Sequence, residues 1–119
     1  MNIPASFTDI KEYFSPKIVA EVNNEYVKLA KIKGQEVPWH THENEDELFY
    51  IVSGELLMEI EEKDSFILET GDMFVVKKGT THRVSSKEEC LIILIESKTT
   101  KHTGDVSSAI TKTIEQQSY

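Results

Sequence analysis

The sequence has few of the features that mark several common classes of protein. A single cysteine, Cys90, excludes an internal disulfide framework. No run of about 18 apolar residues is present, so we expect no membrane-spanning segment and no membrane partner. The first residues, MNIPASFTDIKEYF, lack the basic start and the apolar stretch of a signal peptide. Together these absences predict a soluble cytoplasmic protein.

Positive charge is also scarce. The chain has 13 lysines and arginines against 21 acidic residues, which gives a net charge of −8. Arg83 is the only arginine, so bidentate arginine contacts to phosphate groups cannot be numerous. An acidic surface repels a phosphate backbone, and we therefore expect no nucleic-acid partner.

The length and the hydrophobic content indicate one folded domain. With 119 residues, of which 39% are hydrophobic, the chain can build a core and is not typical of disordered proteins. No repeat with a period of about 20–50 residues divides it. We expect a single domain over residues 1–119, with a barrel core at about residues 17–96.

Short apolar runs separated by turn residues occupy residues 17–96. This pattern is typical of an all-β antiparallel sandwich or barrel. The Asn23-Asn24 pair suits a tight turn between the first two strands. The predicted strands are Lys17–Val22, Glu25–Lys33, Leu48–Val52, Glu55–Ile60, Ser65–Glu69, Met73–Val76, Thr81–Ser85 and Cys90–Glu96.

Short helices are predicted at both ends of the chain. Thr8–Phe14 fits a short helix that Thr8 or Asp9 would cap and that Pro16 would end. Residues 105–117 fit a terminal helix, because the apolar positions recur at a spacing of four along one stripe.

Three histidines and one glutamate carry the pattern of a metal site. His40 and His42 are two residues apart, so on a strand both face the same side. Glu47 follows closely enough to reach the same point after a bend, and His82 lies on another predicted strand. Three imidazoles and one carboxylate suit Fe, Mn, Ni, Cu or Zn as a divalent ion. Calcium and magnesium prefer more oxygen ligands.

The spacing of these residues resembles two sequence motifs of the cupin family. Every fixed position of the first motif, G-x5-H-x-H-x3–4-E-x6-G, is matched by Gly34, His40, His42, Glu47 and Gly54. The second motif, G-x5-P-x-G-x2-H-x3-N, is matched by Gly71, Gly79 and His82, with Lys77 in place of proline and Ser86 in place of asparagine. The segment Asn44–Tyr50 and the small size are similar to single-domain cupins described as mannose-6-phosphate isomerase-like.

The resemblance implies a jelly-roll β-barrel that holds one divalent transition metal inside it. The metal ligands would be His40, His42, Glu47 and His82. If Glu47 and His82 point inward, the period of two predicts that Phe49, Ile51 and Val84 line a small apolar pocket. Phe74 and Val76, or else Met73 and Val75, would line the opposite wall.

The pocket predicts a small polar organic or sugar-like molecule as the substrate or ligand. One hypothesis is a metal-dependent enzyme, either a dioxygenase or an isomerase, lyase or decarboxylase. No further histidine or carboxylate is clearly placed to act as a general base, so no catalytic residue is assigned beyond the metal ligands. The alternative is a non-catalytic binding or sensor module. A structural or storage role fits the complete ligand set less well.

Three other residues have simpler interpretations. Cys90 opens an apolar strand and is expected to be a buried small hydrophobic residue. Arg83 alternates with His82 and should therefore point outward. His102 is expected to lie in a polar loop.

We also expect a homodimer. Leu48–Val52 and Cys90–Glu96 are apolar on both faces, and only one face of each can meet the interior. A terminal helix and a second subunit would cover the outer face. Alternatively, the N-terminal segment, with Phe7, Ile10, Tyr13 and Phe14, would cover it and leave a monomer.

Overall fold

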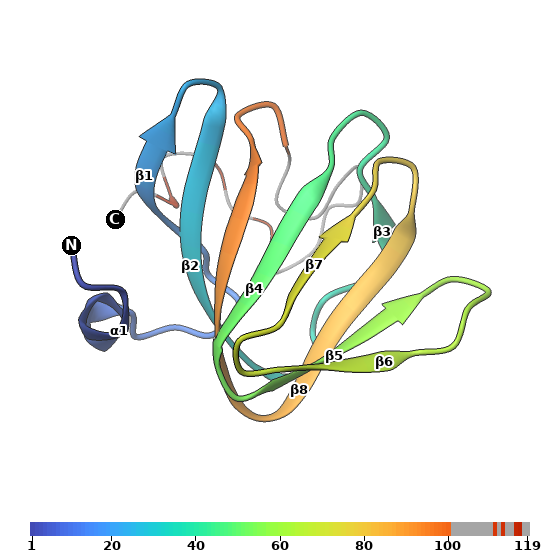
Figure 1. Cartoon of the computed structure of the whole chain (residues 1–119), viewed down its shortest axis with the longest axis horizontal. Coiled ribbons are helices and arrows are strands. Elements are labelled where there is room, and N and C mark those ends of the chain that lie inside the picture. Colours follow the sequence, from blue (N-terminus) through green and yellow to red (C-terminus); the bar gives the residue numbers. More distant parts are fainter. Residues whose placement is uncertain (101–110, 112, 114–115, 118–119) are drawn as a thin grey trace.

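The computed structural model shows two antiparallel β-sheets that share one long strand, β8 (Figure 1). It describes residues 1–100, 111, 113 and 116–117. One sheet has the strand order β1-β2-β8-β4-β7. In the other, β3 and β5 pair with the first half of β8, and β6 pairs with β5. This arrangement confirms the predicted all-β jelly-roll. No helix in the described part of the chain is long and apolar enough to cross a membrane.

The strands begin and end close to the predicted positions. Three of them, β1, β5 and β7, have the predicted bounds, and Asn23 adopts the positive φ of 51° that a tight turn requires. The strands are β1 (Lys17–Val22), β2 (Glu25–Gly34), β3 (His40–Thr41), β4 (Glu47–Ser53), β5 (Glu55–Ile60), β6 (Phe66–Glu69), β7 (Met73–Val76) and β8 (Thr81–Ser97).

The prediction of two separate strands, Thr81–Ser85 and Cys90–Glu96, was wrong, because both belong to β8. The first half of β8 pairs with β5, where Ser85 lies opposite Leu57. The second half pairs with β2 and β4. Between the halves, residues 87–89 are exposed, and the pairing with β2 is irregular. The polar segment is therefore the bend at which β8 passes from one sheet to the other.

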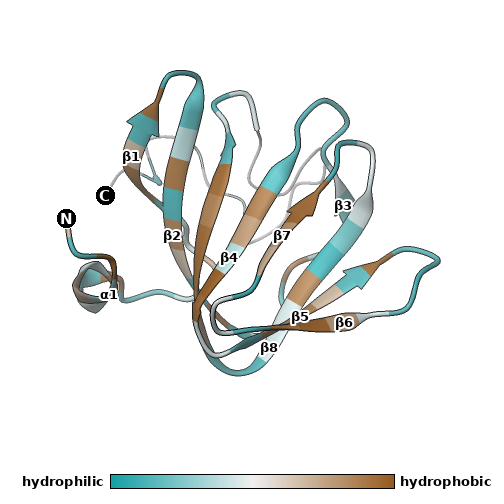
Figure 2. Cartoon of the chain, in the orientation of Figure 1, coloured by the Kyte–Doolittle hydropathy of each residue, from teal (hydrophilic) through white to brown (hydrophobic). Residues whose placement is uncertain are grey.

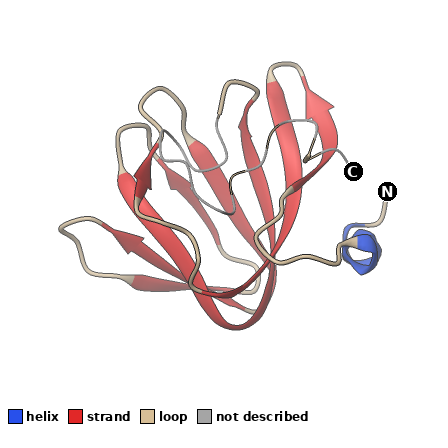
Figure 3. Cartoon of the chain, turned by 180° about the vertical axis from the view of Figure 1, so that it is seen from behind, coloured by secondary structure: helices blue, strands red, loops and turns tan. Residues whose placement is uncertain are grey.

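The helix predicted over Thr8–Phe14 was also wrong. Helix α1 covers Ile3–Ser6, and a 3₁₀-helix, η1, covers Phe7–Asp9. Asn2 caps α1, because its side-chain oxygen accepts a hydrogen bond from the Ala5 amide at 2.9 Å. Figure 3 shows that helical structure in the described chain is confined to this N-terminal segment. The following residues leave the helix because the Phe14 amide donates a hydrogen bond to the Lys31 carbonyl of β2.

Two hydrophobic clusters hold the fold together. The main cluster fills the space between the sheets, where Ile51, Leu56 and Met58 are fully buried. A second cluster lies on the outer face of the first sheet, where Phe7 and Ile10 pack with Leu29 of β2. Figure 2 shows hydrophobic residues along the strands and hydrophilic residues in the turns at their ends. Phe7 and Ile10 thus cover part of the outer face, as one of the two sequence-based alternatives expected. Tyr13 and Phe14 do not, because Tyr13 is exposed and Phe14 packs in the main cluster.

The predicted terminal helix over residues 105–117 lies almost entirely outside the described residues. Gln117 is described and buried, and its backbone oxygen accepts a hydrogen bond from the Ile18 amide at 2.6 Å. Residues 116 and 117 therefore lie beside β1, where the Lys17 ammonium also donates to the Gln116 carbonyl at 3.1 Å.

Candidate metal centre

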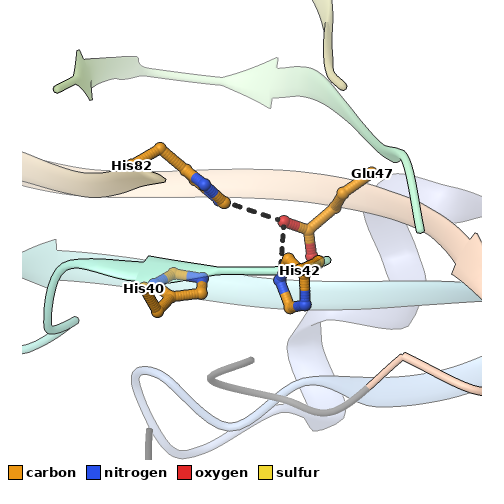
Figure 4. A group of neighbouring side chains, drawn as sticks. All are labelled: His40, His42, Glu47 and His82. Carbon is orange, nitrogen blue, oxygen red and sulfur yellow. Dashed lines mark ion pairs between the residues drawn. The ribbon is translucent and has the colours of Figure 1, made fainter. Parts of the chain in front are cut away.

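The four predicted ligand residues converge inside the barrel. His40 is the first residue of β3, and His42 comes directly after the end of that strand. Glu47 is the first residue of β4, and His82 is the second residue of β8. One ligand atom from each residue can be chosen so that all four atoms lie within 4.8 Å of one another. All four residues are buried, and Figure 4 shows their side chains pointing toward one another. The group could hold a metal ion.

Backbone pairing explains why residues so far apart in the sequence meet. His40 of β3 lies directly opposite His82 of β8. The next pair, Thr41 and Thr81, shares a hydrogen bond of 2.7 Å between the two hydroxyl groups. The carbonyl of His42 accepts a hydrogen bond from the Gly79 amide at 2.8 Å. Gly79 has a φ of +80°, so this close turn suits glycine.

The two departures from the family motif are both accommodated. Lys77 replaces the usual proline of the turn before β8, and Asp46 fixes this turn instead. Its carboxylate accepts a hydrogen bond from the Lys78 amide at 2.8 Å and lies 3.6 Å from the Lys77 ammonium. Ser86 replaces asparagine, and its hydroxyl donates to the Glu55 carbonyl at 2.9 Å. Because Asp46 directly precedes Glu47, the turn is tied to a ligand residue.

Backbone carbonyls fix the orientation of two imidazole rings. His40 Nδ1 lies 2.8 Å from the Pro38 carbonyl, and His82 Nδ1 lies 3.0 Å from the Thr80 carbonyl. A carbonyl only accepts hydrogen bonds, so each Nδ1 carries the proton. This arrangement leaves Nε2 of each ring as the nitrogen that is available to bind a metal.

Two of the histidine nitrogens lack a hydrogen-bond partner. His42 Nε2 and His82 Nε2 lie 3.6 and 3.4 Å from Glu47 Oε1, which is longer than an ordinary hydrogen bond. Both nitrogens are buried and unpartnered. Buried polar atoms without partners are rare and point to an ion or a ligand. A metal ion bound at the cluster would give both nitrogens a partner.

The electrostatics favour the ligand forms of His40 and Glu47. Burial, reinforced by the neighbouring His82, lowers the pKa of His40 from 6.5 to about 4, so its imidazole is neutral at pH 7. Burial opposes the ionisation of Glu47. The contacts with His42 and His82 outweigh burial, however, and hold the pKa of Glu47 well below its usual range. His40 thus presents a neutral nitrogen, and Glu47 presents a carboxylate, as metal binding requires.

Sequence reasoning missed a buried lysine–glutamate pair next to the cluster. The Lys28 ammonium lies 2.6 Å from Glu96 Oε1, and both side chains are buried. Glu96 of β8 is paired directly with Glu47 of β4, and both side chains are buried. Burial, together with the charge of Glu47, raises the pKa of Glu96 well above its usual range. The sequence signal that could have revealed these two residues is a charged residue at an inward-facing position of each strand. In β8, Glu96 follows Ile92 and Leu94 at a spacing of two.

The predicted lining residues lie in the interior of the barrel. Phe49, Ile51, Val76 and Val84 belong to the main hydrophobic cluster, and Phe74 packs against it. The Phe49 ring meets the His82 ring edge-on, with 6.3 Å between the ring centroids. Met73 is 61% exposed, which favours Phe74 and Val76 over the alternative pair on β7.

The other residues singled out in the sequence lie away from the cluster or outside the described chain. Cys90 is fully buried, and desolvation raises the pKa of its thiol from 9.0 to about 11. Arg83 pairs with Glu59 and lies over the Trp39 ring, 4.6 Å from its centroid. Both residues behave as expected, the first as a hydrophobic residue and the second as a surface residue. His102 lies outside the described residues.

Comparison with known proteins identifies the same architecture. The sequence profile of the cupin domain family matches residues 30–96, which include all four candidate ligands. The chain is similar to a cupin-2 domain containing protein from Shewanella frigidimarina. The crystal structure of that protein matches with a TM-score of 0.78 and 34% identity, over 82% of this chain and 94% of the other.

Two curated proteins are also similar. YdbB of Bacillus subtilis, an uncharacterized protein, is 35% identical over 97 residues, which cover 82% of this chain and 85% of YdbB. A protein of Arthrobotrys oligospora named as an oxidoreductase is 26% identical over 95 residues. That match covers 76% of this chain but only 38% of the fungal protein.

Proposed function

Because the chain belongs to the cupin family, we propose that it is a metal-dependent enzyme that acts on a small polar organic molecule. The proposed metal ligands are His40, His42, Glu47 and His82. The observation that carries this proposal is the pair of buried, unpartnered Nε2 atoms of His42 and His82, which lie beside a buried carboxylate.

The residues around the cluster have separable roles in this proposal. A divalent transition metal bound there would supply a Lewis acid and a place for substrate oxygen atoms. The carbonyls of Pro38 and Thr80 hold the rings of His40 and His82 in the orientation that binds it. Glu47 contributes the negative charge that balances part of the charge of the metal. These contacts fix the ring orientations through the backbone.

The proposed pocket has apolar walls. Its proposed lining residues are Phe49, Ile51, Phe74, Val76 and Val84, all of which lie in or against the main hydrophobic cluster. Apolar walls exclude water and leave the metal as the main polar anchor for a substrate. A small molecule with an oxygen-bearing head group and a short carbon skeleton, such as a sugar-like compound, fits such a site.

Both redox and non-redox reactions are compatible with this ligand set. The similarity to a protein named as an oxidoreductase supports the redox reaction, in which the enzyme would be an oxygenase. The metal identity separates the two. Iron, manganese or copper would support oxygenation, whereas zinc or nickel would support isomerase, lyase or decarboxylase chemistry.

Elemental analysis of protein purified without added metal tests the proposal. We expect one equivalent of a transition metal per chain, strongly reduced in His40→Ala and His82→Ala but not in His102→Ala. Equal loss in all three variants would contradict the ligand assignment. Oxygen consumption and product analysis with small sugar-derived acids then test catalysis. Metal-loaded protein that binds such compounds without converting them would instead be the non-catalytic binding module.

A further inference from the structure

A polar layer extends from the candidate ligand Glu47 across the inner face of the first sheet. The register of the strands places Tyr26 of β2 opposite Glu96 of β8, and Glu96 opposite Glu47 of β4. Two residues further along each strand, Leu94 pairs with Phe49 on the same face of the sheet, and both are buried in the main cluster. Charged side chains thus occupy inward positions directly beside the apolar core.

Lys28 is the one lysine of the described chain that is almost fully buried, with 1% of its surface exposed. Its ammonium contacts Glu96 at 2.6 Å, donates to the Gln117 side-chain oxygen and lies 5.8 Å from the centroid of the Tyr26 ring. Burying a lysine and a glutamate is expensive, and an apolar pair of similar volume would stabilise the interior as well or better. Stability alone therefore does not account for the pair.

The position of Glu96 suggests what the pair does. Glu96 is paired directly with Glu47 across β8 and β4, and both side chains are buried on the inner face of the sheet. On its other side, Glu47 faces the Nε2 atoms of His42 and His82. Glu47 thus lies between the histidines and Glu96, and Glu96 in turn contacts Lys28. Residues that contact a metal ligand and orient it in this way commonly raise metal affinity by about 10- to 100-fold.

We propose that Glu96 and Lys28 are positioning residues for Glu47, which they hold in the orientation that binds the metal. This inference rests on the proposed function, since it assumes a metal at the cluster. It predicts a specific consequence of losing Glu96. Without that carboxyl group, the buried Lys28 ammonium loses its acidic partner and pairs with Glu47, where it competes with the metal.

Titration of the metal-free full chain with Mn(II), followed by electron paramagnetic resonance, tests this inference. We expect Glu96→Leu to weaken Mn(II) binding about 10- to 100-fold and to change the spectrum of the bound ion. Glu96→Gln keeps an oxygen for Lys28 and can donate an N–H to Glu47, so we expect it to recover most of the loss. Ser86→Ala is the matched control, because Ser86 is a buried polar residue of the same strand that contacts Glu55 instead.

Thermal unfolding of each metal-free variant shows whether it folds. If Glu96→Leu does not fold, Lys28→Met gives the same test, because it removes the group that holds Glu96 and should also weaken Mn(II) binding and alter the spectrum. A folded Glu96→Leu or Lys28→Met variant with wild-type affinity and spectrum would overturn the inference alone. Wild-type protein that binds no Mn(II) or other transition metal would overturn the proposed function together with it.

Discussion

The carbonyl groups that bind the Nδ1 atoms of His40 and His82 both lie two residues before the histidine. This shared spacing means that the local backbone, and not a distant side chain, sets each ring orientation. Local features of this kind, like the spacing of the ligands in the motif, can be read from the sequence. The four ligands could therefore be predicted. Lys28 and Glu96 could not, because their partnership depends on the pairing of β2 with β8.

Cys90 gives a pH prediction that is independent of the metal cluster. Burial raises the pKa of its thiol from 9.0 to about 11, so the folded state keeps the proton after the unfolded chain has lost it. Stability from this group is complete below pH 9 and is lost as the pH rises toward 11. The total loss is about 3 kcal/mol, at about 1.4 kcal/mol per pH unit.

Urea unfolding of the wild type and of Cys90→Ala, at pH 8 and pH 10, measures this loss. The variant lacks the thiol, so its free energy of unfolding should fall less between the two pH values. The difference between the two proteins is the quantity of interest, because other groups also titrate in this range. Equal decreases in both would show that Cys90 ionises in the folded state as easily as in the unfolded chain.

At the scale of the elements, hydrophobic alternation predicted most strands but not how they connect. The exposed segment Lys87–Glu89 has the composition of a loop, and the sequence therefore indicated two strands. In the structure it is the bend of β8 between the sheets, where the polar side chains face solvent. The local composition indicates only that a segment is exposed to solvent. Here the exposed segment is a bend within one strand and not a loop between two strands.

In the N-terminal segment, the sequence predicted a regular element that the structure does not contain. Its polar and apolar residues suggested a helix over Thr8–Phe14, but Phe7 and Ile10 bury against Leu29 in the second cluster. Phe14 instead joins the main cluster, with a positive φ of 55°. Tertiary packing on the outer face of the sheet decided the backbone conformation, and local propensity was too weak to oppose it.

This packing predicts that the N-terminal segment contributes to the stability of the barrel. Phe7 and Ile10 are 2% and 1% exposed, so replacing either with alanine should lower the free energy of unfolding by about 2–5 kcal/mol. Tyr13→Phe is the control, since it removes only an exposed hydrogen bond to Glu89 and should change stability by less than about 1 kcal/mol. Urea unfolding measures all three. A loss below 1 kcal/mol for both alanine variants would show that the segment covers the sheet without stabilising it.

At the scale of the whole molecule, the N-terminal segment covers only part of the outer face of the first sheet. It packs against Val52, Leu91 and Ile93. Tyr50 and Met73, which are paired across β4 and β7, remain 37% and 61% exposed. This part of the outer face is the area that a second subunit would cover.

The homodimer expected from the sequence therefore stays a prediction, and we place its interface at Tyr50 and Met73. Sedimentation equilibrium at micromolar concentration should give twice the chain mass of 13.6 kDa. Met73→Glu should shift the protein toward the monomer, because a buried carboxylate without a partner is unfavourable at an interface. A mass of 13.6 kDa that does not change with concentration would show that the N-terminal segment alone covers enough of the sheet.

The proposed function requires that one transition metal binds between His40, His42, Glu47 and His82. The most direct test is an anomalous difference map from crystals of the protein loaded with a transition metal, measured at the absorption edge of that metal. We predict one strong peak per chain, bonded to one atom of each of the four side chains. A peak at any other position, or no peak at these residues in fully loaded protein, would contradict the account.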